Sequence, residues 1–418
     1  SRGLGDVYKR QPNDRGAYIY LDGSYTGDGQ FDIDTLSGWG APNFQGAVVN
    51  SYTEKDVVLN AVDGVMTFTG NKAGDAGGAV YNAPLALNGN GSMTLNGKSV
   101  FNGNEAGRGG AVYNEGTLTF NGDAEFSGNI ATGSGEWYGG GAILNVDGNI
   151  SVAEGAELSF TGNTSNSYGG AVYNGTYQNN ANGTIDFTKA ASVTFSNNHA
   201  GANYSGGGIM NENGAVKLGN GVKFENNTAG AGGGAIMSTT GVANETGTAT
   251  PVATVEIGTG AQFLNNEAGS GGAIHNQRGT LTIGENALFQ GNTAKTYAGG
   301  AIYSETISGY PAAKVTIKNG ARFIGNKSET SHGGAIFQYI AKDASLNSVL
   351  DVQGATFEGN IAAKTGGAIS NWGGEGTVTG TFKNNEAGTY GGAIYHDKYE
   401  TIGFPYLTIN GGTTFENN

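Results

Sequence analysis

Two short patterns of apolar and polar residues alternate along most of this chain. In the first, Phe-x-x-Asn, the phenylalanines lie about 31.5 residues apart on average, at Phe68, Phe101, Phe126, Phe160, Phe195, Phe224, Phe263, Phe289, Phe323, Phe357, Phe382 and Phe415. In the second, two glycines and a small residue precede an aliphatic residue, at Val80, Val112, Ile143, Val172, Ile209, Ile236, Ile274, Ile302, Ile336, Ile369 and Ile394. Repeats of this length are typical of proteins built from stacked supersecondary units.

Short segments in each repeat have the alternation expected of β-strands. An apolar, polar, apolar triplet lies between the aliphatic residue and the next Phe, as in residues 118–120 (LTF) and 315–317 (VTI). Period two is the strand signature, and no segment has the helical period of 3.6. Asn-Gly pairs such as Asn96-Gly97 favour sharp turns with positive φ after several triplets. Each repeat is therefore expected to hold three short strands.

A right-handed, single-stranded parallel β-helix of about eleven to twelve coils accounts best for these repeats. The unit from Phe101 to Phe126 has about the length of one three-sided coil, whereas a propeller blade needs four strands. Neighbouring coils hydrogen-bond at about 4.8 Å, so equivalent side chains should form columns along the axis. The predicted structural ladder contains the phenylalanines from Phe68 to Phe382 and an asparagine column that includes Asn71, Asn104, Asn129 and Asn163.

The regular repeats occupy residues 68–418, which we interpret as β-helix truncated at its C-terminal end. Residues 12–67 are less regular and are expected to form an N-terminal cap or degenerate coils, because GAVVN at 46–50 resembles a worn copy of the second pattern. Residues 1–11, SRGLGDVYKRQ, resemble a translated sequencing adapter of the kind found in metagenomic assemblies, and we exclude them from the fold prediction.

Composition and charge narrow the class of protein. The 78 glycines and only 6 prolines suit a narrow solenoid better than a collagen or a flexible linker. A net charge of −14 without a basic cluster makes nucleic acid and anionic membranes poor partners. No cysteine is present, which excludes a disulfide framework. We find no apolar run long enough for a membrane span and no signal peptide, so we expect the chain to be a fragment of a secreted protein.

With its two patterns alternating, as in FTGNKAGDAGGAVYN at 68–82 and FNGNEAGRGGAVYN at 101–114, the chain resembles the polymorphic outer-membrane protein family, named for chlamydial proteins. The resemblance covers about residues 68–418. It implies a β-helical passenger of an autotransporter, displayed on the surface of a Gram-negative bacterium and often acting in adhesion. It also implies that membrane contact occurs only through a C-terminal barrel or another anchor, which this sequence does not contain.

An aromatic column follows the aliphatic one by a single residue. Its aromatic members include Tyr81, Tyr113, Tyr173, Tyr303, Phe337 and Tyr395. Alternation places this column opposite the Ile/Val column, so it is expected to be external and could bind a protein or glycan on a host or neighbouring cell. The competing interpretation is stacking between coils that merely stabilises the sheet.

Candidate chemistry is sparse. Asp186, Lys217 and Glu256 fall on consecutive coils, which leaves a polysaccharide lyase or hydrolase as an alternative function, although their alternating signs favour a solvated charge ladder. Four histidines, His199, His275, His332 and His396, lack the spacing of metal ligands. We therefore predict no catalytic, cofactor-binding or metal-binding residues, and we expect a non-enzymatic adhesin or structural binding rod.

Overall fold

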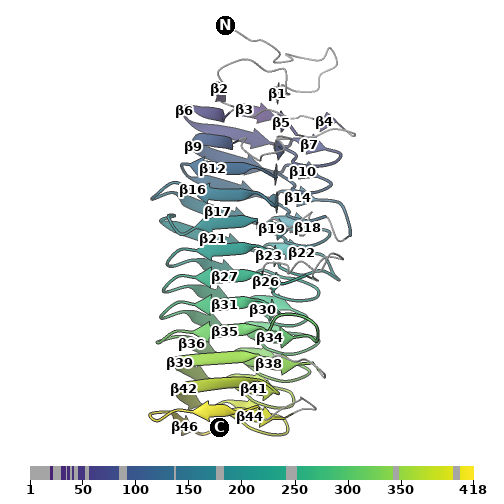
Figure 1. Cartoon of the computed structure of the whole chain (residues 1–418). Coiled ribbons are helices and arrows are strands. Elements are labelled where there is room, and N and C mark those ends of the chain that lie inside the picture. Colours follow the sequence, from purple (N-terminus) through teal and green to yellow (C-terminus); the bar gives the residue numbers. More distant parts are fainter. Residues whose placement is uncertain are drawn as a thin grey trace.

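The computed structural model describes residues 19–21, 30–33, 35–37, 40–41, 46–51, 56–83, 92–135, 138–175, 183–241, 252–341, 348–398 and 405–418. Residues 1–11 lie outside this range. The described part contains strands and no α-helix, and every strand pairing in it is parallel. The coils stack into one elongated rod, with the first described strands at one end and the last at the other (Figure 1). The parallel β-helix predicted from the repeats is confirmed.

Sheet A contains the strands that begin at the Ile/Val positions. It has thirteen strands, each paired with its counterpart in the next coil: β1 (Ile19–Leu21), β5 (Val48–Ser51), β8 (Val80–Ala83), β11 (Val112–Asn114), β15 (Ile143–Val146), β19 (Val172–Gly175), β23 (Ile209–Glu212), β26 (Ile236–Thr239), β30 (Ile274–Gln277), β34 (Ile302–Thr306), β38 (Ile336–Ile340), β41 (Ile369–Trp372) and β44 (Ile394–Asp397). The first two lie within residues 12–67 and extend the same column, since Val48 pairs with Val80 and Ile19 with Val48.

Sheet B contains two columns of strands. The triplets form β2 (Gln30–Ile33), β6 (Val57–Thr69), β9 (Ser92–Asn102), β12 (Thr117–Asn121), β16 (Asn149–Val152), β20 (Thr184–Phe187), β24 (Ala215–Leu218), β27 (Thr254–Ile257), β31 (Thr280–Ile283), β35 (Lys314–Ile317), β39 (Val349–Glu358), β42 (Glu375–Lys383) and β45 (Leu407–Ile409). The Phe segments form β3 (Thr35–Ser37), β13 (Ala124–Ser127), β17 (Glu157–Thr161), β21 (Ser192–Ser196), β25 (Lys223–Glu225), β28 (Gln262–Leu264), β32 (Leu288–Gln290), β36 (Arg322–Ile324) and β46 (Thr414–Glu416).

The long strands β6, β9, β39 and β42 run through both columns of sheet B. Asn96-Gly97, predicted to form a sharp turn, lies inside β9 instead. Gly97 has the expected positive φ of 108°, but β9 pairs with β6 on both sides of it, and with β12 before it and β13 after it, so the strand bends there without ending.

A fourth column of two-residue strands, sheet C, follows each Phe-x-x-Asn. It comprises β4 (Gly40–Ala41), β7 (Lys72–Ala73), β10 (Glu105–Ala106), β14 (Ile130–Ala131), β18 (Thr164–Ser165) and β22 (His199–Ala200), then β29 (Glu267–Ala268), β33 (Thr293–Ala294), β37 (Lys327–Ser328), β40 (Ile361–Ala362) and β43 (Glu386–Ala387). Single bridges at Thr228 connect the two stacks. Three strands per coil are expected from the sequence, and this fourth one is not, because two residues are too few to show an alternation.

The interior of the rod is a stack of phenylalanines. From Phe68 to Phe415, the rings of successive coils lie 4.5–5.1 Å apart. All members from Phe68 to Phe382 are fully buried, together with the Ile/Val residues of sheet A from Val48 to Ile369. The stack follows from the coil spacing, since strands about 4.8 Å apart bring equivalent rings into face contact.

The asparagine of each Phe-x-x-Asn forms a second buried ladder. Asn227 illustrates it: its Oδ1 accepts hydrogen bonds from the backbone N (3.1 Å) and Nδ2 (2.9 Å) of Asn198. Its Nδ2 donates to Asn266 Oδ1 at 3.0 Å and to the carbonyl of Phe195 at 2.9 Å. Every hydrogen-bonding position of the buried amide is therefore used, which explains why the repeat requires Asn and not merely a polar residue.

The Gly-Gly pair has a separate cause at each position. In the coil of β26, Gly233 adopts a φ of +64°. A residue with a side chain would be strained in this backbone conformation, whereas glycine is not. At Gly234, an added Cβ would lie 2.3 Å from the carbonyl oxygen of Gly272 in the next coil. The pair thus allows a left-handed turn followed by close contact between the backbones of adjacent coils.

Candidate functional site

The residue after each Ile/Val points to the opposite side of sheet A from the phenylalanine core. We call this set the outer column: Tyr81, Tyr113, Leu144, Tyr173, Met210, Met237, His275, Tyr303, Phe337, Ser370 and Tyr395. Its apolar members form two clusters apart from the main core, one from Tyr113 to Met237 and one around Tyr303 and Phe337.

The exposure expected for the outer column is wrong for four of its six predicted aromatic members. Tyr113 and Tyr173 are 2% exposed, Tyr303 is 3% exposed and Phe337 is fully buried. Only Tyr81 and Tyr395 are partly exposed. Alternation correctly separates the column from the core, but it cannot show that another part of the coil covers it.

The cover comes from the turns between sheet C and sheet A. Tyr297 packs edge-on against Tyr303 and Phe337, with ring centroids 5.5 and 6.1 Å apart. Near the N-terminal end, the guanidinium of Arg108 lies 5.2 Å from the ring centroid of Tyr113. The rings also stack between coils, with centroids 5.0 Å apart for Tyr81 and Tyr113. An open aromatic strip, which the predicted partner-binding site requires, is therefore missing from the described residues.

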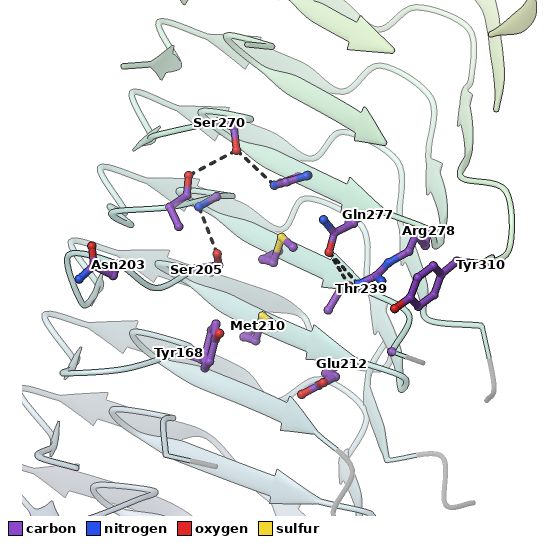
Figure 2. Close-up of a pocket in the computed structure, with 15 residues that line it drawn as sticks. Tyr168, Asn203, Ser205, Met210, Glu212, Thr239, Ser270, Gln277, Arg278 and Tyr310 are labelled. Atoms are coloured by element: carbon purple, nitrogen blue, oxygen red, sulfur yellow. Dashed lines mark hydrogen bonds between the residues drawn. The ribbon is translucent and has the colours of Figure 1, made fainter. Parts of the chain in front are cut away.

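Three successive members of the outer column, Met210, Met237 and His275, are not tyrosines. Above them lies a pocket of about 560 Å³ (Figure 2). The column resumes on either side, since Met210 pairs with Tyr173 and His275 with Tyr303. Thioether and imidazole side chains fill less of the space that tyrosine rings occupy elsewhere, so the turns leave a hollow over these coils.

The two walls of the pocket come from different parts of the coil. One wall is formed by the turns that precede sheet A and carries Tyr168, Asn203, Ser205 and Ser270. On this wall Tyr168 packs edge-on against Tyr204, with ring centroids 4.9 Å apart. The opposite wall is formed by the ends of the sheet A strands and the connections that follow, and carries Glu212, Thr239, Gln277, Arg278 and Tyr310.

A hydrogen-bond network fixes the second wall. Arg278 Nη2 donates to Thr239 Oγ1 at 2.8 Å and to Gln277 Oε1 at 2.9 Å. Thr239 Oγ1 also donates to Gln277 Oε1 at 2.9 Å, and Gln277 Nε2 donates to Glu305 Oε2 at 2.8 Å. The chain of contacts holds the Gln277 amide in one orientation, with its oxygen toward Arg278 and its nitrogen toward Glu305.

Arg278 occupies an unusual position. Its φ is +63°, and its guanidinium lies 4.1 Å from the ring centroid of Tyr310. Burial lowers the pKa of Arg278 from its usual value, although a guanidinium remains charged in proteins. Among the described residues, no carboxylate forms an ion pair with it. Its buried Nε has no hydrogen-bond partner within the described part of the chain.

Two carboxylates lie near Arg278 but contact other groups. Burial alone would raise the pKa of Glu305, but His275, whose Nε2 lies 3.6 Å from Glu305 Oε2, and the Gln277 amide lower it overall. Glu212 accepts a hydrogen bond from the hydroxyl of Tyr173 at 2.5 Å. The charge of Arg278 is therefore held by neutral oxygen atoms and an aromatic face.

Sequence analysis did not single out Arg278, Tyr310, Gln277 or Glu212. The available signal was the loss of Tyr at three consecutive positions of the outer column. A second signal is the asparagine two residues after the aliphatic in the coils before the pocket, which forms a buried ladder from Asn50 to Asn211. That ladder changes to Ser238 in the pocket coils. Neither signal reveals the connection that brings Tyr310 to the pocket.

The charged column behind the alternative enzymatic function lies on sheet B. Asp186 pairs with Lys217, and Lys217 with Glu256, on adjacent strands. Partial burial would raise the pKa of Asp186, but hydrogen bonds from Thr188 lower it overall. A general acid needs the opposite shift.

The described residues contain no group of three or more His, Asp or Glu placed to hold a metal ion. No helix in that part of the chain is long and apolar enough to cross a membrane.

Comparison with family models identifies eight segments as the Chlamydia polymorphic membrane protein repeat, at residues 66–83, 98–115, 157–175, 192–212, 221–239, 286–305, 354–371 and 379–397. Each segment contains one Phe-x-x-Asn and the Ile/Val position that follows it. No curated protein and no solved structure matches the chain. The matched segments contain most of the Phe and Asn ladders and most of the outer column, but not Leu144, His275 or Phe337.

Proposed function

Because this chain belongs to the family of proteins with the Chlamydia polymorphic membrane protein repeat, we propose that it is the passenger of a surface-displayed autotransporter-type protein and that it acts as an adhesin. The family places such proteins at the outer membrane or cell surface. Its partners would be proteins or glycans on a host cell or a neighbouring cell.

The observation that carries this proposal is a rigid repeating rod with a variable corner. The inner ladders hold every coil in register, so the rod can project without a compact globular core. The connection from sheet A to sheet B varies in length: for example, it has two residues, 115–116, between β11 and β12 and seven, 307–313, between β34 and β35. Variation at one corner leaves the ladders intact and supplies loops for contact with a partner.

The net charge of −14 is also consistent with a partner other than nucleic acid, because a protein needs basic residues to bind the phosphate backbone. Weak contacts repeated along a rod would add up by multivalency, as adhesion to a surface requires.

Beads coated with the full chain test the adhesin function. We expect them to attach to epithelial or bacterial cells in greater number than beads coated with the heat-denatured chain or with an unrelated acidic β-helical protein. Equal attachment of the three bead types would refute adhesion. Antibodies to the chain should stain intact cells of the producing bacterium, and staining only after permeabilisation would refute surface display.

A further inference from the structure

We propose that the pocket above Met210, Met237 and His275 binds a sugar that carries a carboxylate, and that Arg278 contacts this carboxylate. The inference rests on the proposed adhesin function, because it names a ligand class for one site on the same rod. At about 560 Å³, the pocket has the size of a small-molecule site.

Arg278 supplies the charge that selects an acid. This half-buried guanidinium contacts neutral oxygen atoms and the face of Tyr310, and Glu305 and Glu212 attract it without forming an ion pair with it among the described residues. A buried charge usually has a closer opposite partner. The hydrogen bonds to Thr239 and Gln277 both use Nη2, and Arg278 also interacts with Tyr310. A ligand carboxylate is the acceptor that best matches a guanidinium in charge and planar shape.

The rest of the wall suits the hydroxyl groups of a sugar. Glu212 lies two coils from Gln277, at the other end of the polar wall, because Glu212 pairs with Thr239 and Thr239 with Gln277. Its carboxylate accepts hydrogen bonds and would repel a second acid. A ligand with one carboxylate and several hydroxyls fits this separation of charge, with its acid at Arg278 and its hydroxyls toward Glu212.

Aromatic side chains on both walls suit the apolar face of a sugar ring. Tyr168 lies on one wall and Tyr310 on the other, with the methionines between them (Figure 2). The edge contact with Tyr204 and the cation–π contact with Arg278 hold the two rings in place. Apolar surfaces with a few oriented polar groups are typical of small-molecule sites.

An extended peptide fits the pocket less well. Peptides commonly add a strand to an open sheet edge, where backbone groups are available. Here the floor is the face of sheet A, and its backbone is paired between coils, for example from Ile209 N to Ala235 O at 2.8 Å and from Ile236 N to Ala273 O at 2.9 Å. Recognition must therefore use side chains, which favours a compact sugar.

Calorimetric titration of the full chain distinguishes the two sources of such a sugar. The probes are the methyl glycoside of N-acetylneuraminic acid, for host sialoglycans, and methyl glucuronide, for glycosaminoglycans or capsules. We expect one acid to bind at least tenfold more tightly than its own methyl ester, which retains the ring but lacks the charge. Equal affinity of acid and ester, in both pairs, would overturn the inference.

Two variants test the site itself. Arg278→Gln should weaken binding of the acid at least tenfold, and Met237→Tyr should abolish it by restoring the aromatic column. Arg322→Gln is the matched control, because Arg322 is an exposed arginine on β36 of sheet B. Its affinity should equal that of the unmodified chain. Thermal unfolding checks that each variant is folded, and a folded Met237→Tyr that still binds the acid would refute the assignment.

Failure of this inference differs from failure of the adhesin proposal. If beads carrying the chain attach to cells while neither acid binds, the pocket assignment is wrong and adhesion stands. A tetraglutamate peptide with acetylated and amidated ends serves as an acidic probe that is not a sugar. If it binds more tightly than both acids, the ligand class is wrong. If both the Arg278→Gln substitution and the addition of free acid reduce attachment of the beads to cells, the pocket is linked directly to adhesion.

Discussion

Two stretches of the rod share the same inner ladders but differ on the outer face of sheet A. From β34 to β41, Tyr303 and Phe337 stack 5.4 Å apart, and His332 and Trp372 pack around them. From β23 to β30, Met210, Met237 and His275 lie under a pocket. The comparison shows that the coil register is set inside the rod, so the outer column can change without loss of the fold. The candidate site arises where that column is interrupted.

The largest expected effect is on the ladder that both stretches share. Replacing Asn227 with Leu would remove the side-chain acceptor of the buried Asn198 backbone N–H. It would also remove one hydrogen bond each from Asn198 Nδ2, Asn266 Oδ1 and the Phe195 carbonyl. We expect a loss of roughly 5 kcal/mol of unfolding free energy, measured by urea denaturation.

Asn326→Leu tests the same ladder in the aromatic stretch and should cost the same as Asn227→Leu. The exposed Asn102→Leu serves as the control and should change stability by less than about 0.5 kcal/mol. Costs that differ by several kcal/mol between the two ladder positions would show that the stretches do not share one inner structure.

Truncation of the outer column should separate the two stretches. Phe337→Ala removes a fully buried ring and should lower the free energy of unfolding by roughly 4 kcal/mol. Met237→Ala removes a side chain that already borders a hollow, so we expect about 2 kcal/mol or less. Equal losses in urea denaturation would contradict the description of one stretch as filled and the other as open.

Acid should weaken the aromatic stretch through His332. Burial, aided by the charge of Lys364, lowers the pKa of His332 to about 4, below its usual value of 6.5. The unfolded chain therefore binds a proton that the folded chain resists. The neutral ring contributes fully to the free energy of unfolding above pH 6.5, and this contribution is lost as pH falls to about 4. The loss is at most about 3 kcal/mol.

Comparison of the unmodified chain with His332→Asn between pH 7 and pH 4 measures this contribution. The variant should lose less stability over the range, although it starts lower because it lacks the contact with Trp372, at a centroid distance of 4.3 Å. A parallel loss in both proteins would exclude His332 as the cause.

The smallest expected effect is a gain. Met237→Phe places a ring between Met210 and His275 and should bury more apolar surface at the floor of the pocket. We expect about 1 kcal/mol of added stability, seen as a higher melting temperature. A loss of stability would indicate that the turns above the pocket cannot accommodate the filled column.

Much of the fold could be predicted because a solenoid repeats its contacts. Each coil meets only its neighbours, so a residue that recurs in sequence also recurs in space. The phenylalanine and asparagine columns therefore follow from spacing alone, as does the assignment of all strands to parallel stacks. The two-residue strands of sheet C escaped prediction because their pairing depends on neighbouring coils and not on a local alternation.

The sequence by itself determined the inner face of the rod: its repeat length, its buried ladders and the side of sheet A on which the outer column lies. Only the tertiary structure decided that turns cover that column, and that Arg278, Tyr310 and Tyr168 meet around three interrupted positions. The physical reason is that ladder contacts recur at a fixed rise along the axis. The pocket instead depends on how non-repeating turns and connections from several coils pack against one another, and no periodicity encodes that packing.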